Sequence, residues 1–315
     1  MENYQMIAKT LAGLENVLLE EIEALGGLNI QKRKRAILFE GDDSLMIKSN
    51  ICLRTAISIL IPIFEFKARD EFELYNEIHA VQWEEIFGVN DTFAISATVS
   101  GELFTHSQYV ALKTKDAMVD RFRKKFGKRP NVDVSNADYQ FNVHIQYDSC
   151  TISLNSSGLP LNRRGYRINS NEAPLNEVLA AGIILKSGWN KQDDFYDPMS
   201  GSGTFAIEAA LLANNIAPGL NRRFGFQNWS DFDRDLYRAV HQEVKSQISP
   251  KEVNIYCRDL LIENLEYIAQ NSEEINVQQY IDIGREDFFH SSKKGENGIL
   301  FFNPPYGERL ELEEI

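Results

Sequence analysis

A glycine-rich turn follows a short apolar strand in the second half of the chain. The turn reads Asp197-Pro198-Met199-Ser200-Gly201-Ser202-Gly203, and the helix-forming run FAIEAALLA comes one residue later. Two glycines let a backbone approach a ligand closely, and the first turn of a helix offers N–H groups without internal partners. This order of strand, glycine turn and helix is typical of a site for a nucleotide-like ligand.

Two interpretations of the turn are open. Gly201, Gly203 and Ala206 fit G-x-G-x-x-A, the fingerprint of dinucleotide-binding oxidoreductases, which expects an acid about 20 residues on. Here the segment 217–250 intervenes before the next strand and its Asp259. Asp197, ahead of the glycines, would repel a pyrophosphate but attract the ammonium group of a methionine-like ligand. The pattern therefore favours S-adenosylmethionine.

Two further acids follow later strands of the same half. Asp259 comes after NIYCR, and Asp287 lies in GREDFF. Because carboxylates accept hydrogen bonds, we expect Asp259 to accept them from the ribose hydroxyls and Asp287 from the adenine amine. The alternative at these positions, as at Asp197, is a carboxylate that caps a helix or closes a turn.

An Asn-Pro-Pro-Tyr turn, residues 303–306, ends the strand-like run 298–302. Proline cannot continue a sheet, so the chain turns stiffly there and fixes the atoms before it. The Asn303 side-chain oxygen and the Pro304 carbonyl can accept both hydrogens of an exocyclic aromatic amine, while Tyr306 stacks on the base. The amine nitrogen gains positive charge as it attacks a methyl group, so acceptors suffice and no strong base is needed. A turn that only closes a strand is the alternative.

The elements around these residues fall into two styles. Up to about residue 156, short strands alternate with expected helices at 11–25, 43–54, 71–87 and 107–126, and a hairpin is expected around Asp148-Ser149. From about residue 174, helices alternate with expected strands at 195–197, 253–257, 279–283 and 298–302. The first part is therefore predicted to be α+β, and the second a parallel α/β sheet.

A basic stretch stands out in the first half. Residues 113–129, KTKDAMVDRFRKKFGKR, hold eight cations against two acids, +6 in a protein of net charge −13. A solvated helix face is one interpretation, and a phosphate-binding surface is the other. The candidate residues of this surface are Lys113, Lys115, Arg121, Arg123, Lys124, Lys125, Lys128 and Arg129, to which the family resemblance given below adds RNA as the ligand. The acidic total excludes indiscriminate coating of nucleic acid.

Length and composition narrow the class of protein. The chain has 315 residues, 43% hydrophobic and 25% charged, which indicates a globular protein of about two domains. The longest apolar run, 55–64, is half of the ~20 residues that a membrane span needs, and Glu2 stands where a signal peptide would be positive. Three separated cysteines and five unpaired histidines predict neither disulfides nor a metal site. We expect a cytoplasmic protein.

Five strings together resemble a known family, the class I RNA methyltransferases that carry a THUMP domain. In particular, they resemble the RlmL/YpsC-like 23S rRNA guanine-N2 methyltransferases. The strings are SQYVALKTKDAMVDRFRKKFGKRPNVD, SLNSSGLPLNRRGYR, EAPLNEVLAAGIILKSGW, YDPMSGSGTFAIEAALLANNIAPG and NPPYGERL. They cover almost the whole chain.

The resemblance implies three parts: a ferredoxin-like unit (1–43), a THUMP RNA-binding domain (44–155) and a Rossmann-like class I S-adenosylmethionine-dependent methyltransferase domain (156–315). It implies that the cofactor contacts Asp197, Pro198, Ser200, Gly201, Gly203, Asp259 and Asp287, and that the target amine contacts Asn303, Pro304 and Tyr306. Arg163, Arg164 and Arg167 would bind RNA where the RNA-binding and catalytic parts join, and Pro174 and Glu177 would lie beside the methionine end of the cofactor.

The resemblance also has departures. The family often carries a second acid where this chain has Leu261, and a glycine where it has Cys257. Because such domains continue past the Asn-Pro-Pro-Tyr turn, we expect this chain to end inside its methyltransferase domain. The expected activity is methylation of guanine N2 in 23S rRNA, with RNA as partner and neither membrane nor metal. The alternatives are tRNA guanine-N2 methylation, adenine-N6 methylation of a nucleic acid, and a noncatalytic RNA-binding scaffold.

Overall fold

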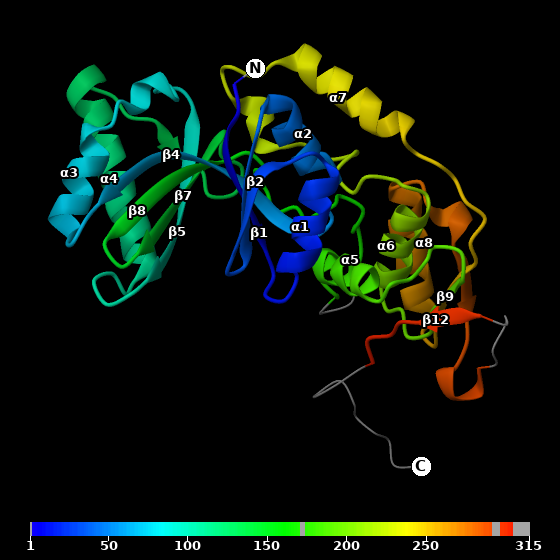
Figure 1. Cartoon of the computed structure of the whole chain (residues 1–315). Helices are drawn as coiled ribbons and strands as arrows, with labels where there is room; N and C mark the ends of the chain where they lie inside the picture. The colour runs from blue at the N-terminus through cyan, green and yellow to red at the C-terminus, as the bar shows by residue number, and fades with distance from the viewer. Residues whose placement is uncertain (1, 171–173, 292–296, 305–315) are drawn as a thin grey trace, which may run out of the picture. The chain divides into compact units, whose positions relative to one another are not determined.

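The computed structural model describes residues 2–170, 174–291 and 297–304 (Figure 1). The chain forms two compact units. The N-terminal unit comprises residues 1–50, 56–161 and 223–240, and the C-terminal unit comprises 51–55, 162–222 and 241–315.

The N-terminal unit is built on one sheet. Its eight strands among the described residues have the order β2-β3-β1-β4-β8-β7-β5-β6. Their bounds are β1 (Tyr4–Thr10), β2 (Leu28–Arg33), β3 (Ala36–Gly41), β4 (Ala56–Lys67), β5 (Thr92–Ser100), β6 (Asn131–Val132), β7 (Tyr139–Gln146) and β8 (Ser149–Asn155). The helices that begin in this unit are α1 (Glu15–Ala24), α2 (Asp43–Cys52), α3 (Glu71–Ala80), α4 (Ser107–Phe126) and α7 (Arg234–Ser246), of which α2 and α7 end within the C-terminal unit.

Alternation along the strands makes the core of this sheet. In β7, Phe141, Val143 and Ile145 are buried, whereas His144 and Gln146 between and after them are exposed. The buried face packs on α4 through Met118 and Phe122, and Trp83 meets Phe141 edge to face at 5.4 Å. The period of two therefore decides which face receives the helices.

Local backbone chemistry shortens two expected helices. The first begins at Glu15 because Gly13, with φ of 89°, turns the chain just before it. The expected helix 71–87 ends at Ala80, because the backbone of Val81 is extended. Trp83 then starts a 3₁₀ turn, η1 (Trp83–Glu85). The Trp83 indole donates to the Ile78 carbonyl at 2.8 Å. The expected helix 107–126 and the hairpin at Asp148 are confirmed.

The C-terminal unit holds the expected parallel sheet. Its strands among the described residues are β9 (Asp194–Asp197), β10 (Ile255–Asp259), β11 (Asp282–Arg285) and β12 (Gly298–Leu300), in the order β11-β10-β9-β12. All three pairings are parallel. Helices α5 (Glu177–Lys186), α6 (Thr204–Ala213) and α8 (Ile262–Glu274) alternate with the strands. This is a Rossmann-like α/β fold.

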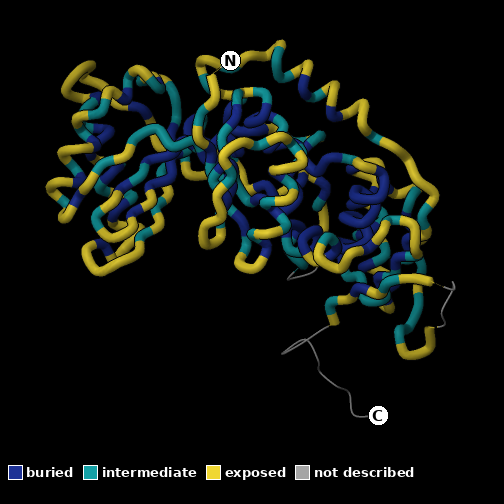
Figure 2. Tube along the Cα trace, in the orientation of Figure 1, coloured by how far each residue is buried: buried dark blue, intermediate teal, exposed yellow. Residues whose placement is uncertain are grey.

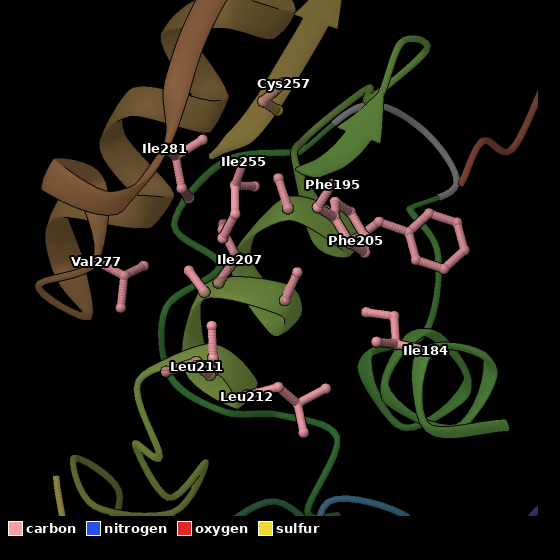
Figure 3. Close-up of a cluster of buried hydrophobic side chains, with 14 of the residues drawn as sticks. Ile184, Phe195, Phe205, Ile207, Leu211, Leu212, Ile255, Cys257, Val277 and Ile281 are labelled. Atoms are coloured by element: carbon pink, nitrogen blue, oxygen red, sulfur yellow. The ribbon is translucent and has the colours of Figure 1, made fainter. Parts of the chain in front are cut away.

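Helix α6 lies at the centre of this unit. Every residue from Thr204 to Ala213 is buried, and Figure 2 shows the helix dark along its length. Phe205, Ile207 and Leu211 project into a cluster with Phe195 of β9 and Ile255 of β10 (Figure 3). A helix that is apolar except for Thr204 and Glu208 must be enclosed, which fixes its N-terminus against the carboxyl ends of the strands.

Candidate active site

The glycine turn joins the end of β9 to the start of α6. Gly201 and Gly203 have φ of 53° and 82°, a left-handed backbone that favours glycine. A Cβ on Gly203 would also lie 3.1 Å from the side chain of Ile268 in α8. Gly203 therefore lets α6 start close to α8. The turn is here called the cofactor loop (residues 198–203).

The cofactor loop is tied to the end of β10. The Ser200 amide and hydroxyl donate to the Arg258 carbonyl at 3.0 and 2.7 Å, and the Gly201 amide donates to Asp259 Oδ2 at 2.8 Å. Asp259 Oδ1 accepts from the Leu261 amide and the Asn264 side chain, both at 3.0 Å. Asp259 thus holds the cofactor loop through Oδ2. This oxygen accepts one hydrogen bond from the described residues and can accept another from a ligand.

A cavity of about 720 Å³ opens at this edge of the sheet. Such a volume is in the usual range for small-molecule sites. The sequence-predicted residues that line it are Asp197, Pro198, Ser200, Gly201, Asp259, Asp287, Asn303 and also Pro174. Gly203 does not line it and serves the packing of α6. Residues from the ends of β9, β10 and β11 are therefore brought together, as expected for carboxyl ends of parallel strands.

Asp197 is the most unusual side chain of the site. It is 1% exposed, and neither carboxylate oxygen makes a hydrogen bond of standard geometry with a described residue. Burial raises its pKa well above the ordinary value; the Ala206 backbone amide opposes this rise, and the Asp259 carboxylate adds to it. A buried acid with so little support from donors is costly unless a ligand supplies a cation or donor. The methionine part of S-adenosylmethionine supplies both, so the residues fit this cofactor.

Asp287 caps a short turn at the far side of the cavity. Its oxygens contact the Phe289 amide at 3.0 Å and His290 Nδ1 at 2.8 Å, and both contacts lower the pKa of this carboxyl, His290 the more. Phe288 and Phe289, next in the chain, also line the cavity, and Phe289 is 85% exposed. The sequence reasoning missed these aromatics, although two adjacent phenylalanines after the acid were a visible signal.

Asn303 is half-buried at the cavity wall, directly after Phe301 and Phe302. Phe302 stacks on Phe288 with ring centroids 5.8 Å apart, and Phe301 packs in the core against Phe195 at 4.8 Å. These contacts fix the chain just before the turn. Pro304 is exposed, and Tyr306 lies outside the described residues.

The basic residues of α4 divide into two groups. Arg121 and Lys125 both bind Glu84, at 2.7 and 2.6 Å, and the two contacts lower the Glu84 pKa to about 2, Arg121 the more. Three other cations already have partners: Lys115 pairs with Asp116, Arg123 pairs with Asp120, and Lys113 lies over the rings of Phe72 and Tyr75.

Three cations at the end of this helix differ. Lys124, Lys128 and Arg129 are exposed and form no ion pair with any described residue. Phe126 between them is 48% exposed. We call Lys124, Lys128 and Arg129 the open cation group.

The three arginines of the segment 163–167 also differ in their burial and in their partners. Arg163 is exposed, whereas Arg164 is 2% exposed and pairs at 3.4 Å with Glu208, which is fully buried. Arg167 is half-buried and bonded to Glu177, Ser202 and Thr204. Two of the three cations therefore lie inside the C-terminal unit. The sequence could not show this, because each partner is remote along the chain or belongs to another element.

Within the ranges that the structure describes, no helix is long and apolar enough to cross a membrane. The same residues contain no cluster of three or more His, Cys, Asp or Glu side chains that could hold a metal ion.

The fold and the cavity define a methyltransferase of the Rossmann-like, S-adenosylmethionine-dependent class. Three family models match in succession: the RlmL ferredoxin-like domain at residues 5–60, the THUMP domain at 68–155 and the RMKL-like methyltransferase domain at 164–314. The chain belongs to the RlmL-like, THUMP-containing methyltransferases.

Solved structures agree with this assignment. SMU.472, named as a methyltransferase and crystallised with SAH, is 31% identical with a TM-score of 0.85, over 98% of this chain and 82% of that one. A protein from Listeria monocytogenes, named as a predicted N6-adenine-specific DNA methylase, is 30% identical with a TM-score of 0.88, over 99% and 82%. A methylase-like protein from Clostridium difficile is 32% identical with a TM-score of 0.86, over 98% and 82%.

Proposed function

We propose that this chain binds S-adenosylmethionine in the 720 Å³ cavity and transfers its methyl group to the exocyclic N2 of a guanine in 23S rRNA. The observation that carries the proposal is that one cavity is lined by both the cofactor loop with Asp197 and by Asn303. A methyl donor and an amine acceptor would therefore meet in a single cavity.

The chain's own residues would act by position and charge. Bound S-adenosylmethionine supplies an electrophilic methyl group on a sulfonium. Asp197 would hold the ammonium of its methionine part, Asp259 the ribose and Asp287 the adenine amine. The Asn303 side-chain oxygen and the Pro304 carbonyl would accept the two hydrogens of the target amine as its nitrogen becomes positive. The target nitrogen would gain the methyl group and lose one proton to water, while these two acceptors stabilise the positive charge that it carries in between.

The RNA would be held by the N-terminal unit through the open cation group, with Arg163 as a further contact. These side chains are exposed and unpaired among the described residues, so phosphates can displace only water and counterions there. Four other cations of α4 are paired with Glu84, Asp116 or Asp120, and Lys113 lies over the rings of Phe72 and Tyr75. The boundary at residue 43 between a ferredoxin-like unit (1–43) and a THUMP domain (44–155) stays a prediction.

Asn303→Ala tests the catalytic assignment. We expect methyl transfer to fall about 100-fold, the scale of losing one preorganised acceptor, with cofactor affinity changed less than twofold. The measurement is transfer of labelled methyl to undermodified 23S rRNA followed by nucleoside mass spectrometry, with Asn221→Ala, an exposed asparagine outside the cavity lining, as the control. Equal loss of transfer and of cofactor binding would mean that Asn303 only shapes the wall.

Methylation of adenine N6 is the second candidate, because an Asn side-chain oxygen can accept from either amine. The Listeria monocytogenes relative carries a name of that kind. The same mass spectrometry separates the two, since labelled N6-methyladenosine in place of N2-methylguanosine would replace the first proposal. Label on tRNA alone would change the substrate, and label on neither RNA would favour a noncatalytic scaffold.

A further inference from the structure

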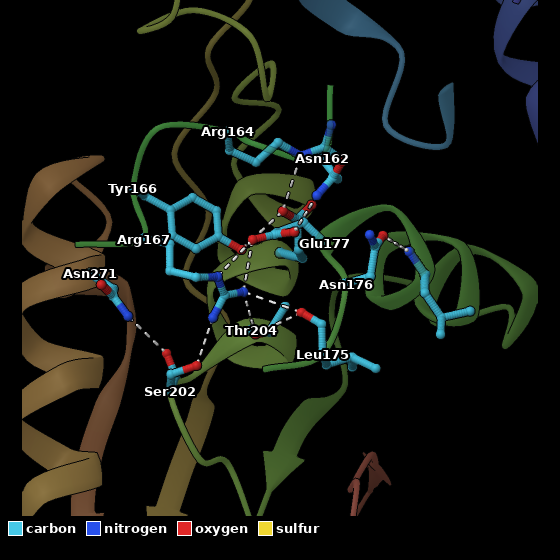
Figure 4. Close-up of polar contacts among 12 residues, drawn as sticks. Asn162, Arg164, Tyr166, Arg167, Leu175, Asn176, Glu177, Ser202, Thr204 and Asn271 are labelled. Atoms are coloured by element: carbon cyan, nitrogen blue, oxygen red, sulfur yellow. Dashed lines mark hydrogen bonds and ion pairs between the residues drawn. The ribbon is translucent and has the colours of Figure 1, made fainter. Parts of the chain in front are cut away.

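The Arg167 guanidinium bonds to the cofactor loop and to the first residue of α6. Its Nη1 donates to the Ser202 hydroxyl at 2.7 Å, and its Nη2 donates to the Thr204 hydroxyl at 2.9 Å (Figure 4). The same guanidinium also reaches the segment at the start of α5, where Nε donates to Glu177 at 2.8 Å and Nη2 to the Leu175 carbonyl at 3.2 Å. One side chain therefore joins the loop before α6 to the start of α5.

Asn271 of α8 holds the same loop from another side. It is fully buried, and its side-chain amide donates to the Ser202 carbonyl at 3.2 Å and the Asn169 carbonyl at 2.9 Å. Its oxygen accepts from the Ile168 amide at 3.0 Å. Ser202 is thus bonded through its hydroxyl by Arg167 and through its backbone by Asn271, and the segment carrying Arg167 is bonded by Asn271 as well.

We propose that Arg167 is a positioning residue which, with Asn271, holds the cofactor loop in its binding conformation. The inference rests on the proposed cofactor site. Arg167 does not line the cavity, but Ser202, Thr204 and Leu175 do, so it acts through them.

The loop needs such support because of its glycines. Gly201 and Gly203 flank Ser202, and glycine loses more backbone freedom on ordering than any other residue. If the ligand must order the loop, the conformational entropy that the loop loses weakens binding. A loop that is already ordered in the free protein avoids this cost. Fixing Ser202 between the two glycines restricts both neighbours at once.

The geometry requires arginine. Three nitrogens of one planar group bond acceptors on two elements, and a lysine ammonium offers one point charge that cannot span them. The Arg167 side chain is 19% exposed and its Glu177 partner 7%, so the charge pair is largely shielded from water. An RNA phosphate would have to compete with these bonds, which makes an RNA contact the rival explanation to test.

The experiment compares Arg167→Gln and Arg167→Lys with Arg163→Gln in the full chain. Arg163 is the matched control, an exposed arginine four residues earlier. The dissociation constant for S-adenosylhomocysteine is measured by calorimetry and that for in vitro transcribed 23S rRNA by filter binding, with a melting curve for each variant. Both Arg167 variants should bind S-adenosylhomocysteine at least tenfold more weakly, about one charge-assisted hydrogen bond, with RNA affinity within twofold. Arg163→Gln should leave the S-adenosylhomocysteine constant unchanged.

Other outcomes overturn the inference. Weaker RNA binding with unchanged S-adenosylhomocysteine affinity would make Arg167 an RNA contact, and no change in either would make the bonds dispensable. If Arg167→Gln does not fold, Arg167→Lys decides: a raised KM for S-adenosylmethionine with the KM for RNA unchanged supports positioning, and equal loss in both refutes it. A wild-type chain that binds S-adenosylhomocysteine but methylates no RNA would contradict only the proposed function, whereas one that binds none would contradict the cofactor site and this inference together.

Discussion

The two units use their positive charges differently. In the C-terminal unit, Arg164 and Arg167 point inward and bond to Glu208, Glu177 and the cofactor loop. In the N-terminal unit, the open cation group stays at the surface without a carboxylate partner among the described residues. Both sets are basic runs in the sequence, so the run alone does not distinguish buried, paired arginines from exposed cations. The position of the nearest acid distinguishes them.

The largest effect is expected from breaking the internal pair. Arg164→Met would leave Glu208 without its main cation in a fully buried place, and we expect about 3–5 kcal/mol of destabilisation. The urea unfolding transition measures it, with Arg163→Met as the exposed control at less than about 0.5 kcal/mol. Similar small shifts for both variants would mean that Arg54, the second cation near Glu208, compensates the charge.

The open cation group should give the next largest effect. Changing Lys124, Lys128 and Arg129 to Gln removes about three phosphate contacts, which should reduce the slope of log affinity against log salt by about 2–3. RNA binding should fall about 100-fold at 0.1 M salt and converge with wild type near 1 M. A matched triple elsewhere, Arg234, Lys245 and Lys251 to Gln, should keep the slope. An equal loss of slope in both triples would assign the effect to net charge.

The paired cations of α4 should give the smallest effect, and on stability only. The folded pKa of Glu84 is lowered from 4.5 to about 2, so its ion pairs stabilise the fold fully above pH 4.5 and lose this effect as pH falls towards 2. Glu84→Gln should cost about 1–2 kcal/mol at pH 7, and the difference from wild type should narrow below pH 4.5. The exposed pair of Asp235 serves as control, since Asp235→Asn should shift the unfolding free energy by less than about 0.5 kcal/mol. A pH-independent difference would contradict the ionic origin.

Much of the site follows from the sequence because its signals are local. Strand, glycines and helix are adjacent at residues 195–213, and the carboxyl-end rule brings Asp259 and Asp287 to the same edge as Asp197. The basic helix 107–126 was equally predictable from its periodicity and from Gly127, which ends it in a left-handed conformation.

What the sequence could not provide depends on contacts between remote segments. Glu84 lies 37 residues from Arg121, and Asn271 lies 69 residues from Ser202, so neither bond has a sequence signature. The single sheet of the N-terminal unit is another example, because the pairing of β4 with β8 joins residues about ninety positions apart. Strand β12 is also shorter than expected, ending at Leu300, since Phe301 turns into the core and Phe302 towards Phe288.

The buried Asp197 carboxyl has a consequence for how binding would be observed. Without a ligand its raised pKa favours the protonated form, and a cation beside it lowers that pKa again. At any pH between these two values, formation of the complex releases part of a proton to the solvent. The heat of cofactor binding should then differ between buffers of different ionisation enthalpy, and the apparent affinity should rise with pH across the same interval.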